Sequence, residues 1–211
     1  MPADIRYLPA KGRSHGALVA IARNRDGDIQ AVQCVFLNDG QKAQIDVPKR
    51  STGVLDGAAV RLPGLRGDEL VIAEGPETAL SVYQAWGRES WIALGSVAKL
   101  VNQLPLDRVV VIARDADQHG SEAAQALEKA MGSMANRGVN LRVAVPPMPT
   151  KAGYDFNDAL QDYSVQVVEN TLIGCMTVKN KIPDAVDIEE ARHAVSQKIH
   201  QFFVAAAANE S

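Results

Sequence analysis

Four short apolar runs alternate with helix-like segments in the middle of the chain, and this alternation leaves few folds open. The runs ELVIAE, SWIALG, DRVVVIARD and NLRVAVPP are too short for helices, and they are almost continuously apolar, as strands buried on both faces of a sheet are. Between them, apolar residues recur at helical spacing in PETALSVYQAWG, SVAKLVNQL and SEAAQALEKAMGSMANRG. This order predicts an α/β fold with a four-stranded parallel sheet flanked by helices.

A different pattern precedes this unit. Asp-Gly pairs at residues 26–27 and 39–40 separate runs that are rich in Val, Ile, Leu and Phe. Asp-Gly between such runs is typical of tight hairpin turns, so the pattern predicts a small antiparallel β subdomain. We expect its strands at about 17–23, 29–37 and 42–47. Residues 1–16 read as an irregular arm, and a loop rich in Gly and Pro ends the subdomain near residue 67.

The pattern of the tail predicts a C-terminal helix in DIEEARHAVSQKIHQFF, where acidic residues at the N-terminal end are followed by apolar residues at helical spacing. The stripe fits packing on the domain's own surface, and docking to a partner or to a further domain is the alternative. The predicted organisation is a β-rich N-terminal subdomain at 1–67, an α/β domain at 68–163 and a C-terminal helical tail at 164–211.

Composition excludes several classes of protein. The hydrophobic share of 46% supports a proper core, while the net charge of −3 means that any nucleic-acid contact needs a local basic patch. Cys34 and Cys175 are far apart and form no CxxC pair, which argues against a zinc ribbon and a disulfide scaffold. No stretch resembles a signal peptide or a membrane span, so we expect a cytoplasmic protein without membrane contact.

Three acidic residues directly follow two of the predicted strands. Glu74 ends the first strand in VIAEGPETAL, and Asp115 and Asp117 end the third in VVVIARDADQHG. Ligands bind open parallel sheets beyond the carboxyl ends of the strands. If these two strands are neighbours, the three carboxylates converge, and their repulsion is costly without a cation. Such hard oxygen ligands predict a site for Mg²⁺ or Mn²⁺, and an ordinary polar strand end is the alternative.

These motifs resemble the Toprim domain, which bacterial-type primases, topoisomerases, OLD-family nucleases and RecR-type proteins share. Its hallmark is a Glu after the first strand and a DxD after a later one. The segment KAGYDFNDAL resembles the K-D-x-N-D-x-L element that follows this domain in phage and plasmid primase-like proteins. The resemblance covers about residues 68–163, and the strands before it look like the small N-terminal subdomain of a primase core. The chain therefore resembles the primase-like branch of the Toprim family.

The resemblance implies metal-dependent nucleotidyl transfer with Mg²⁺ or Mn²⁺ as the cofactor. Asp115 and Asp117 would hold the ion, and Glu74 would act as a general acid or base or as a metal ligand. An ion of this kind neutralises charge that develops on a phosphate and helps to orient the attacking oxygen.

The resemblance also implies an additional acidic and phosphate-binding site. Lys151 would contact a phosphate, and Asp155 and Asp158 would extend the acidic cluster. The alternative for this segment is helix N-capping by Asp155 or Asn157. Glu77 either belongs to the acidic site or only interacts with the positive N-terminal end of its helix.

Two departures from the family pattern narrow the function. Topoisomerases carry a Glu two residues after the DxD, where this chain has His119, and no domain for a strand-cleaving tyrosine is apparent. We therefore expect no topoisomerase activity and interpret His119 as a solvent-facing loop residue. A zinc-binding domain and a P-loop are also not apparent, so template recognition and helicase activity would come from elsewhere.

Basic residues gather in the N-terminal third and would form a nucleic-acid-binding ledge that faces the metal site. A merely solvated basic face is the alternative. We expect Trp86, Trp91 and Cys34 to be core residues. The candidate nucleic-acid-binding residues are Lys49, Arg50, Arg61 and Arg66.

The function that these observations predict is primer synthesis on single-stranded DNA in the replication or transfer of a phage, plasmid or conjugative element. The expected partners are single-stranded DNA and nucleotides, together with a helicase, a relaxase or a zinc-binding template-recognition domain. One alternative is a Toprim nuclease that hydrolyses phosphodiesters with the same carboxylates. Another is a non-catalytic Toprim module that binds nucleic acid or protein within a larger replication or relaxase protein.

Overall fold

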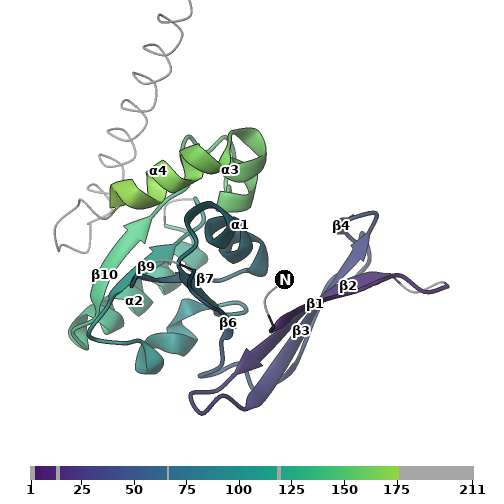
Figure 1. Cartoon of the computed structure of the whole chain (residues 1–211), viewed down its shortest axis with the longest axis horizontal. Coiled ribbons are helices and arrows are strands. Elements are labelled where there is room, and N and C mark those ends of the chain that lie inside the picture. Colours follow the sequence, from purple (N-terminus) through teal and green to yellow (C-terminus); the bar gives the residue numbers. More distant parts are fainter. Residues whose placement is uncertain (1–2, 13–14, 66, 118–119, 176–211) are drawn as a thin grey trace, which may run out of the picture.

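A computed structural model describes residues 3–12, 15–65, 67–117 and 120–175 of the chain. Two five-stranded sheets organise these residues (Figure 1). The N-terminal sheet is antiparallel and has the order β1-β2-β3-β4, with β5 also paired to β3. The second sheet has the order β10-β9-β7-β8-β6 and carries the helices. The predicted helix in DIEEARHAVSQKIHQFF lies outside the described residues.

The N-terminal sheet confirms the two long strands expected around the first Asp-Gly turn. Its strands are β1 (Ile5–Leu8), β2 (Gly16–Arg23), β3 (Ile29–Asn38), β4 (Gln41–Lys42) and β5 (Lys49–Gly53). The expected irregular arm is wrong for β1, which pairs with β2 along its length. Only one of its four residues is buried, so its sequence carries little strand signal.

The expected strand at 42–47 is also wrong, because the chain leaves the sheet there. The backbone of Phe36 accepts a hydrogen bond from Ala43 N–H but donates its own to the carbonyl of Pro48. The residues between these two partners therefore loop out of the ladder. The chain pairs with β3 again in β5, where the sequence had led us to expect a loop.

The second sheet confirms the α/β fold with four parallel strands. Parallel pairs join β10 to β9, β9 to β7 and β7 to β8, while β6 adds an antiparallel edge strand that was not expected. The strands are β6 (Val60–Leu62), β7 (Leu70–Ala73), β8 (Glu89–Ile92), β9 (Val109–Ala113) and β10 (Asn140–Ala144). The helices are α1 (Pro76–Trp86), the 3-10 helix η1 (Val97–Gln103), α2 (Glu122–Asn136), α3 (Phe156–Asp162) and α4 (Val165–Cys175).

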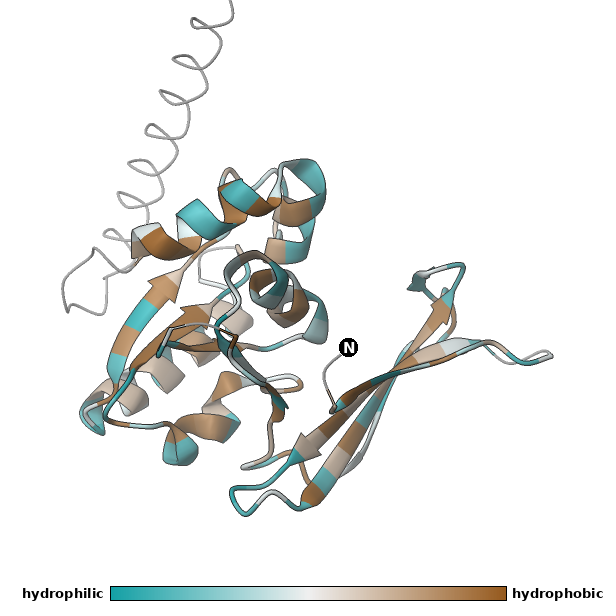
Figure 2. Cartoon of the chain, viewed as in Figure 1, coloured by the Kyte–Doolittle hydropathy of each residue, from teal (hydrophilic) through white to brown (hydrophobic). Residues whose placement is uncertain are grey.

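Helices cover both faces of this sheet, which explains why its strands are apolar without alternation. Val71 and Ala73 of β7 belong to the core beneath α1, α3 and α4, whereas Leu70 and Ile72 belong to the core beneath η1 and α2. All four side chains are buried. Figure 2 shows hydrophobic residues concentrated along these strands and on the helix faces turned toward them.

The two sheets share a core and are joined through the backbone. Arg23 at the end of β2 exchanges two hydrogen bonds with Ala59, at 2.8 and 3.0 Å, and Arg23 also forms an ion pair with Asp4 at 2.9 Å. Ile5 and Ala20 of the N-terminal sheet lie in the same apolar cluster as the α1 side of the second sheet. One core thus crosses the expected boundary near residue 67, and the three-part division of the chain stays a prediction.

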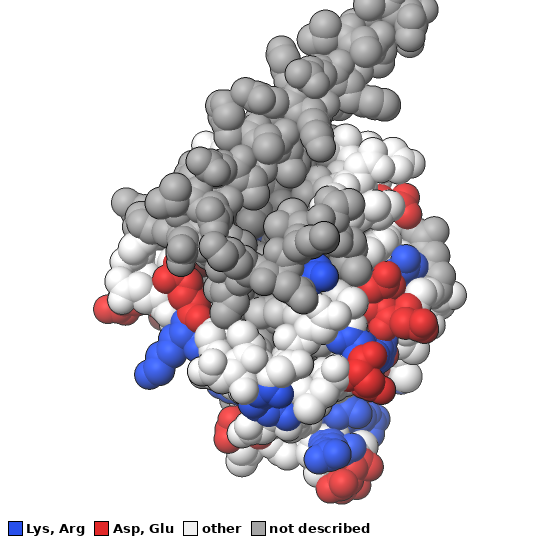
Figure 3. All heavy atoms as spheres, turned by 90° about the vertical axis from the view of Figure 1, so that its left-hand side faces the viewer, with Lys and Arg blue, Asp and Glu red and all other residues white. Residues whose placement is uncertain are grey.

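The burial of the tryptophans and the charge of the surface limit which side chains can contact a ligand. Trp86 and Trp91 are 2% and 9% exposed, which confirms that they are core residues. Cys34 on β3 is half-buried. On the face in Figure 3, the described Lys and Arg residues are interspersed with Asp and Glu and form no continuous basic surface. No helix in the described part of the chain is long and apolar enough to cross a membrane.

The helix α2 provides a test of the core beneath β9. Met131 is fully buried there, so Met131→Ala should lower the free energy of unfolding by about 2–5 kcal/mol. Met131→Leu keeps the volume and should cost less than about 1.5 kcal/mol. Urea unfolding followed by circular dichroism measures both, and equal effects of the two substitutions would contradict this packing.

Candidate functional site

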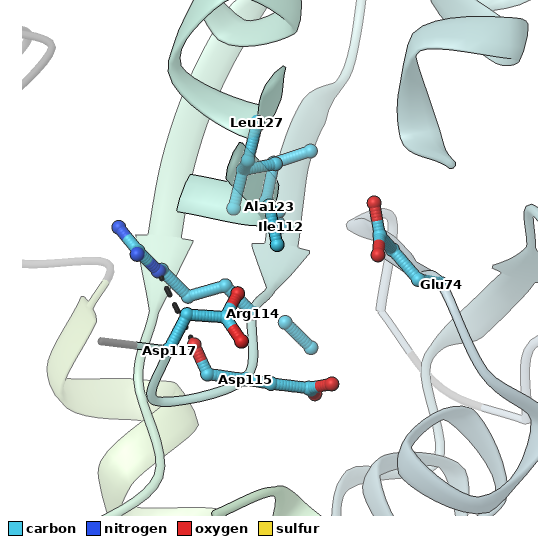
Figure 4. A pocket seen from close by; sticks show the side chains of 8 residues that line it. Glu74, Ile112, Arg114, Asp115, Asp117, Ala123 and Leu127 are labelled. Carbon is cyan, nitrogen blue, oxygen red and sulfur yellow. Dashed lines mark hydrogen bonds between the residues drawn. The ribbon is translucent and has the colours of Figure 1, made fainter. Parts of the chain in front are cut away.

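Strands β7 and β9 are neighbours, so the acidic residues that follow them lie at one edge of the sheet. The two strands pair in parallel, with Leu70 opposite Val110 and Ile72 opposite Ile112. Glu74 comes directly after β7, and Asp115 lies two residues beyond the end of β9. Figure 4 shows the carboxylates of Glu74 and Asp117 facing each other across a hollow, with Asp115 on the side of Asp117. The lining residues are Glu74, Ile112, Ala113, Arg114, Asp115, Asp117, Ala123 and Leu127.

Glu74 is held at one side of this hollow. Val97 N–H, at the start of η1, donates to its Oε1 at 3.4 Å. Burial raises the pKa of Glu74, and repulsion from Asp117 raises it further. The Val97 hydrogen bond and the positive charges of Lys99 and Lys49 oppose this rise.

Asp115 is the most perturbed carboxyl of the site. Burial raises its pKa to about 7, helped by repulsion from Asp155, then Asp117 and finally Glu74. A contact of 3.3 Å with the hydroxyl of Thr78 on α1 acts in the opposite direction. Ionising Asp115 therefore costs free energy in the folded protein, and a nearby cation would recover it.

The loop that carries the DxD motif is fixed between its two aspartates. Ala116 N–H donates to the carbonyl of Tyr154 at 2.8 Å, and Gly153 N–H donates to the carbonyl of Ala116 at 2.9 Å. Tyr154 is buried, and its hydroxyl donates to Asp162 at 2.8 Å. This isolated bridge ties the acidic loop to the segment before α3. The guanidinium of Arg114 points away from Glu74 (Figure 4), so it does not occupy the hollow.

In the segment KAGYDFNDAL, Asp155 both caps a helix and lies near the acidic site. Asp155 accepts from Asp158 N–H at 2.8 Å, and the Asp158 side chain accepts from Asp155 N–H at 3.3 Å, which forms a capping box on α3. The other carboxylate oxygen of Asp155 lies 3.3 Å from Thr78 Oγ1. Lys151 pairs with Asp158 at 3.0 Å, and Asn157 contacts Ser81. The alternative of capping by Asp155 is therefore present, and the charge of the same residue also acts on Asp115.

The remaining candidate residues divide between the site and the scaffold. Glu77 is exposed in the first turn of α1, where its charge suits the positive end of the helix. Lys49 and Arg50 are exposed on β5, and the charge of Lys49 reaches Glu74. Arg61 instead lies over the ring of Trp91 at 4.7 Å and donates to the carbonyl of Asn24. Arg66 and His119 lie outside the described residues.

Two residues of the site went unnoticed in the sequence. Thr78 falls within the EGPETAL motif, one turn of helix after Glu74, and its polarity at a buried first-turn position was the available signal. Lys99 lies on η1, the short helix that follows β8, in the segment SVAKL. Its positive charge acts on Glu74, which is consistent with an anionic ligand at this edge of the sheet.

The donor chemistry fits a hard cation shared with a substrate rather than a closed protein cage. Across the described residues, no group of three His, Cys, Asp or Glu side chains forms a set that could hold a metal ion by itself. Mg²⁺ usually takes one or two carboxylates and completes its coordination with waters and substrate phosphates. Asp115 and Asp117 suit that arrangement, with Glu74 on the opposite side of the hollow. The three-carboxylate ligand set itself stays a prediction.

The part of the chain that carries these side chains matches a known family. Residues 69–165 match the Toprim domain, and residues 1–62 match a domain of unknown function (DUF7146). The chain therefore contains a Toprim domain, as its motifs predicted. No curated protein sequence matches the chain.

Solved primases share the fold. The Aquifex aeolicus primase, with its zinc-binding and RNA polymerase domains, gives a TM-score of 0.53 at 14% identity over 81% of this chain and 43% of its own. The DnaG catalytic domain bound to single-stranded DNA has a TM-score of 0.54 at 18% identity, and the match covers 76% of this chain and 52% of that one. The primase fragment of the bacteriophage T7 primase-helicase has a TM-score of 0.51 at 18% identity, and the match covers 77% of this chain and 64% of that one. This chain thus spans about half the length of the first two proteins. These likenesses show that the chain shares the fold of these primases.

The raised pKa of Asp115 predicts how its removal changes stability with pH. The ordinary value of 3.8 applies to the unfolded chain and about 7 to the folded one, so wild-type stability falls between about pH 4 and pH 7. Asp115→Asn removes this loss, so its stability gain over wild type should grow across that range. Urea unfolding in EDTA measures the difference, with Asp107→Asn at the opposite end of β9 as the control. A gain that does not grow with pH would contradict the environment assigned to Asp115.

The two functions of Asp155 can be separated by substitution. Asp155→Ala removes the N-cap of α3 and should lower the free energy of unfolding by about 0.5–2 kcal/mol. Asp155→Asn keeps a good cap and should cost less, while it also removes a charge that raises the pKa of Asp115. Thermal unfolding and NMR titration of the Asp115 carboxyl carbon measure the two effects. An unchanged Asp115 pKa in Asp155→Asn would refute their interaction.

Proposed function

We propose that the chain is the catalytic part of a DNA primase-like protein, which transfers nucleotides onto a growing primer on single-stranded DNA in a divalent-metal-dependent reaction. The observation that carries this proposal is the juxtaposition of Glu74 with Asp115 and Asp117 at the ends of adjacent parallel strands. The primase-like fold supports it. Its shared part covers 76–81% of the chain and so extends beyond residues 69–165, which match the Toprim domain.

The proposed metal is Mg²⁺ or Mn²⁺, held by Asp115 and Asp117 in the hollow. When bound, it would neutralise charge that develops on the transferred phosphate and help to orient the attacking oxygen. Such a cation would also offset the cost of ionising Asp115, whose pKa is raised by burial and by its acidic neighbours.

Glu74 has a different proposed task. Burial and the negative charge of Asp117 raise its pKa, which makes it a better proton acceptor than an ordinary glutamate. It is therefore suited to take the proton from a primer 3′-hydroxyl as that oxygen attacks. The hydrogen bond from Val97 N–H keeps the Glu74 carboxylate at one side of the hollow.

Positive charge around Glu74 suits nucleotides and template. Lys99 on η1 and Lys49 on β5 interact with Glu74 from two elements, so phosphates at the hollow would meet cations from a helix and from the N-terminal sheet. Arg50 extends this charge along β5, whereas Arg61 is engaged with Trp91. We propose Lys49, Lys99 and Arg50 as phosphate contacts, and a helicase, relaxase or zinc-binding template-recognition domain as the partner in replication or transfer of a mobile element.

A non-catalytic module of a larger replication protein is the second candidate. It is favoured by the absence, in the described part of the chain, of a complete three-residue metal set and by the chain's coverage of about half of its primase neighbours. A Toprim nuclease would use the same carboxylates and differs only in the product formed.

Removing single carboxylates tests the proposal. The purified chain is given single-stranded DNA with an annealed primer, nucleotides of both sugar types and Mg²⁺ or Mn²⁺, so that extension needs no template-recognition domain. Asp117→Asn and Glu74→Gln should each slow primer extension by about 10²–10⁴-fold, because one removes an ion ligand and the other a proton acceptor. Asp107→Asn is the matched control and should extend primers at the wild-type rate.

The products separate the candidates in a sequencing gel. Lengthened primers that depend on Asp117 and Glu74 support nucleotidyl transfer. Shortened DNA with the same dependence identifies a nuclease, and unchanged DNA with wild-type protein favours the binding module. Extension that survives both substitutions would refute the assigned site.

A further inference from the structure

Thr78 places a buried hydroxyl between two carboxylates from two other elements. The residue is 3% exposed on α1, and its Oγ1 lies 3.3 Å from Asp115 Oδ1 and 3.3 Å from Asp155 Oδ2. Asp115 belongs to the acidic loop after β9, and Asp155 begins α3. One side chain thus contacts both the proposed metal ligand and the helix cap beside it.

The hydroxyl is not needed for the helix that carries it. The N-cap of α1 is Gly75, which makes no side-chain cap, and Pro76 at the first position has no N–H to satisfy. Both hydrogen-bond contacts of Thr78 leave α1 and go to other elements. Because the first turn of a helix favours negative charge, the position also suits two carboxylates.

The two carboxylates are not equally free to move. Asp155 is fixed by the capping box with Asp158, so it offers the hydroxyl a stationary partner. Asp115 lies in a loop whose backbone is tied through Ala116 to Tyr154, and its side chain contacts Thr78. A hydroxyl placed against the fixed carboxylate therefore limits the directions in which Asp115 can turn.

We propose that Thr78 is a positioning residue, which sets the orientation of Asp115 for cation binding and links that orientation to the docking of α3 on α1. This inference rests on the proposed function for the role of Asp115. In metal sites generally, groups that hold a ligand from behind change metal affinity or activity by about 10–100-fold when they are removed.

A matched control lies one helical turn further along α1. Ser81 is 4% exposed, and its hydroxyl contacts Asn157 of α3 at 3.4 Å. It therefore joins the same two helices, which lie side by side in Figure 1, without contacting a carboxylate of the site. Ser81→Ala tests whether helix docking alone matters, and Thr78→Val tests the hydroxyl that contacts Asp115.

The experiment measures Mn²⁺ binding by the signal of free Mn²⁺ in electron paramagnetic resonance, so that no activity is needed. Thr78→Val and Thr78→Ala should each weaken Mn²⁺ binding by about 10–100-fold. Thr78→Ser restores the hydroxyl and should bind within about threefold of wild type, as should Ser81→Ala. Circular dichroism and thermal unfolding establish that each variant is folded, and the Ala variant covers the case in which Val does not fit.

The outcomes distinguish this inference from the function on which it rests. Wild-type affinity in the folded Thr78→Ala protein, or equal losses in Thr78→Ala and Ser81→Ala, would overturn the positioning role. If Asp115→Asn binds Mn²⁺ as tightly as wild type, the metal site of the proposed function fails instead. A loss in Thr78→Ala that Thr78→Ser restores supports the inference, whether or not the chain extends primers.

Discussion

Parallel pairing of β7 with β9 is the constraint on which the site depends. It brings Glu74 to one side of a hollow and Asp115 and Asp117 to the other, although about 40 residues separate them in sequence. Their mutual repulsion, added to burial, raises the pKa of Glu74 and Asp115. The fold thus maintains an unfavourable concentration of negative charge, and a divalent cation is the simplest ligand that relieves it.

The remainder of the Toprim unit fixes this concentration of charge in place. Gly153 and Tyr154 hold the acidic loop through backbone hydrogen bonds with Ala116, and Asp155 caps α3 while it contacts Thr78. The helices α1 and α3 therefore do more than cover the sheet, because Thr78 of α1 contacts Asp115 and the N-cap of α3 contacts Thr78. The N-terminal sheet contributes from the other side through Lys49, whose charge reaches Glu74.

The sequence predicted those features of the fold that depend on local patterns of apolar and acidic residues. Apolar runs bounded by Glu74 and by Asp115 indicated both the parallel sheet and the edge at which its acidic residues meet. It did not predict β1 and β5, because nearly all of their side chains are exposed, and only pairing with β2 and β3 defines them as strands. Thr78 was missed for a similar reason. A threonine in the first turn of a helix is unremarkable until the fold shows two carboxylates beside its hydroxyl.

A crystal structure of the chain soaked in Mn²⁺, with anomalous diffraction data, would test the metal site directly. We expect an anomalous peak in the hollow at the ends of β7 and β9, within coordination distance of Asp115 or Asp117 and on the side that Glu74 faces. A peak elsewhere, or an empty hollow at a Mn²⁺ concentration that saturates binding in solution, would contradict this expectation.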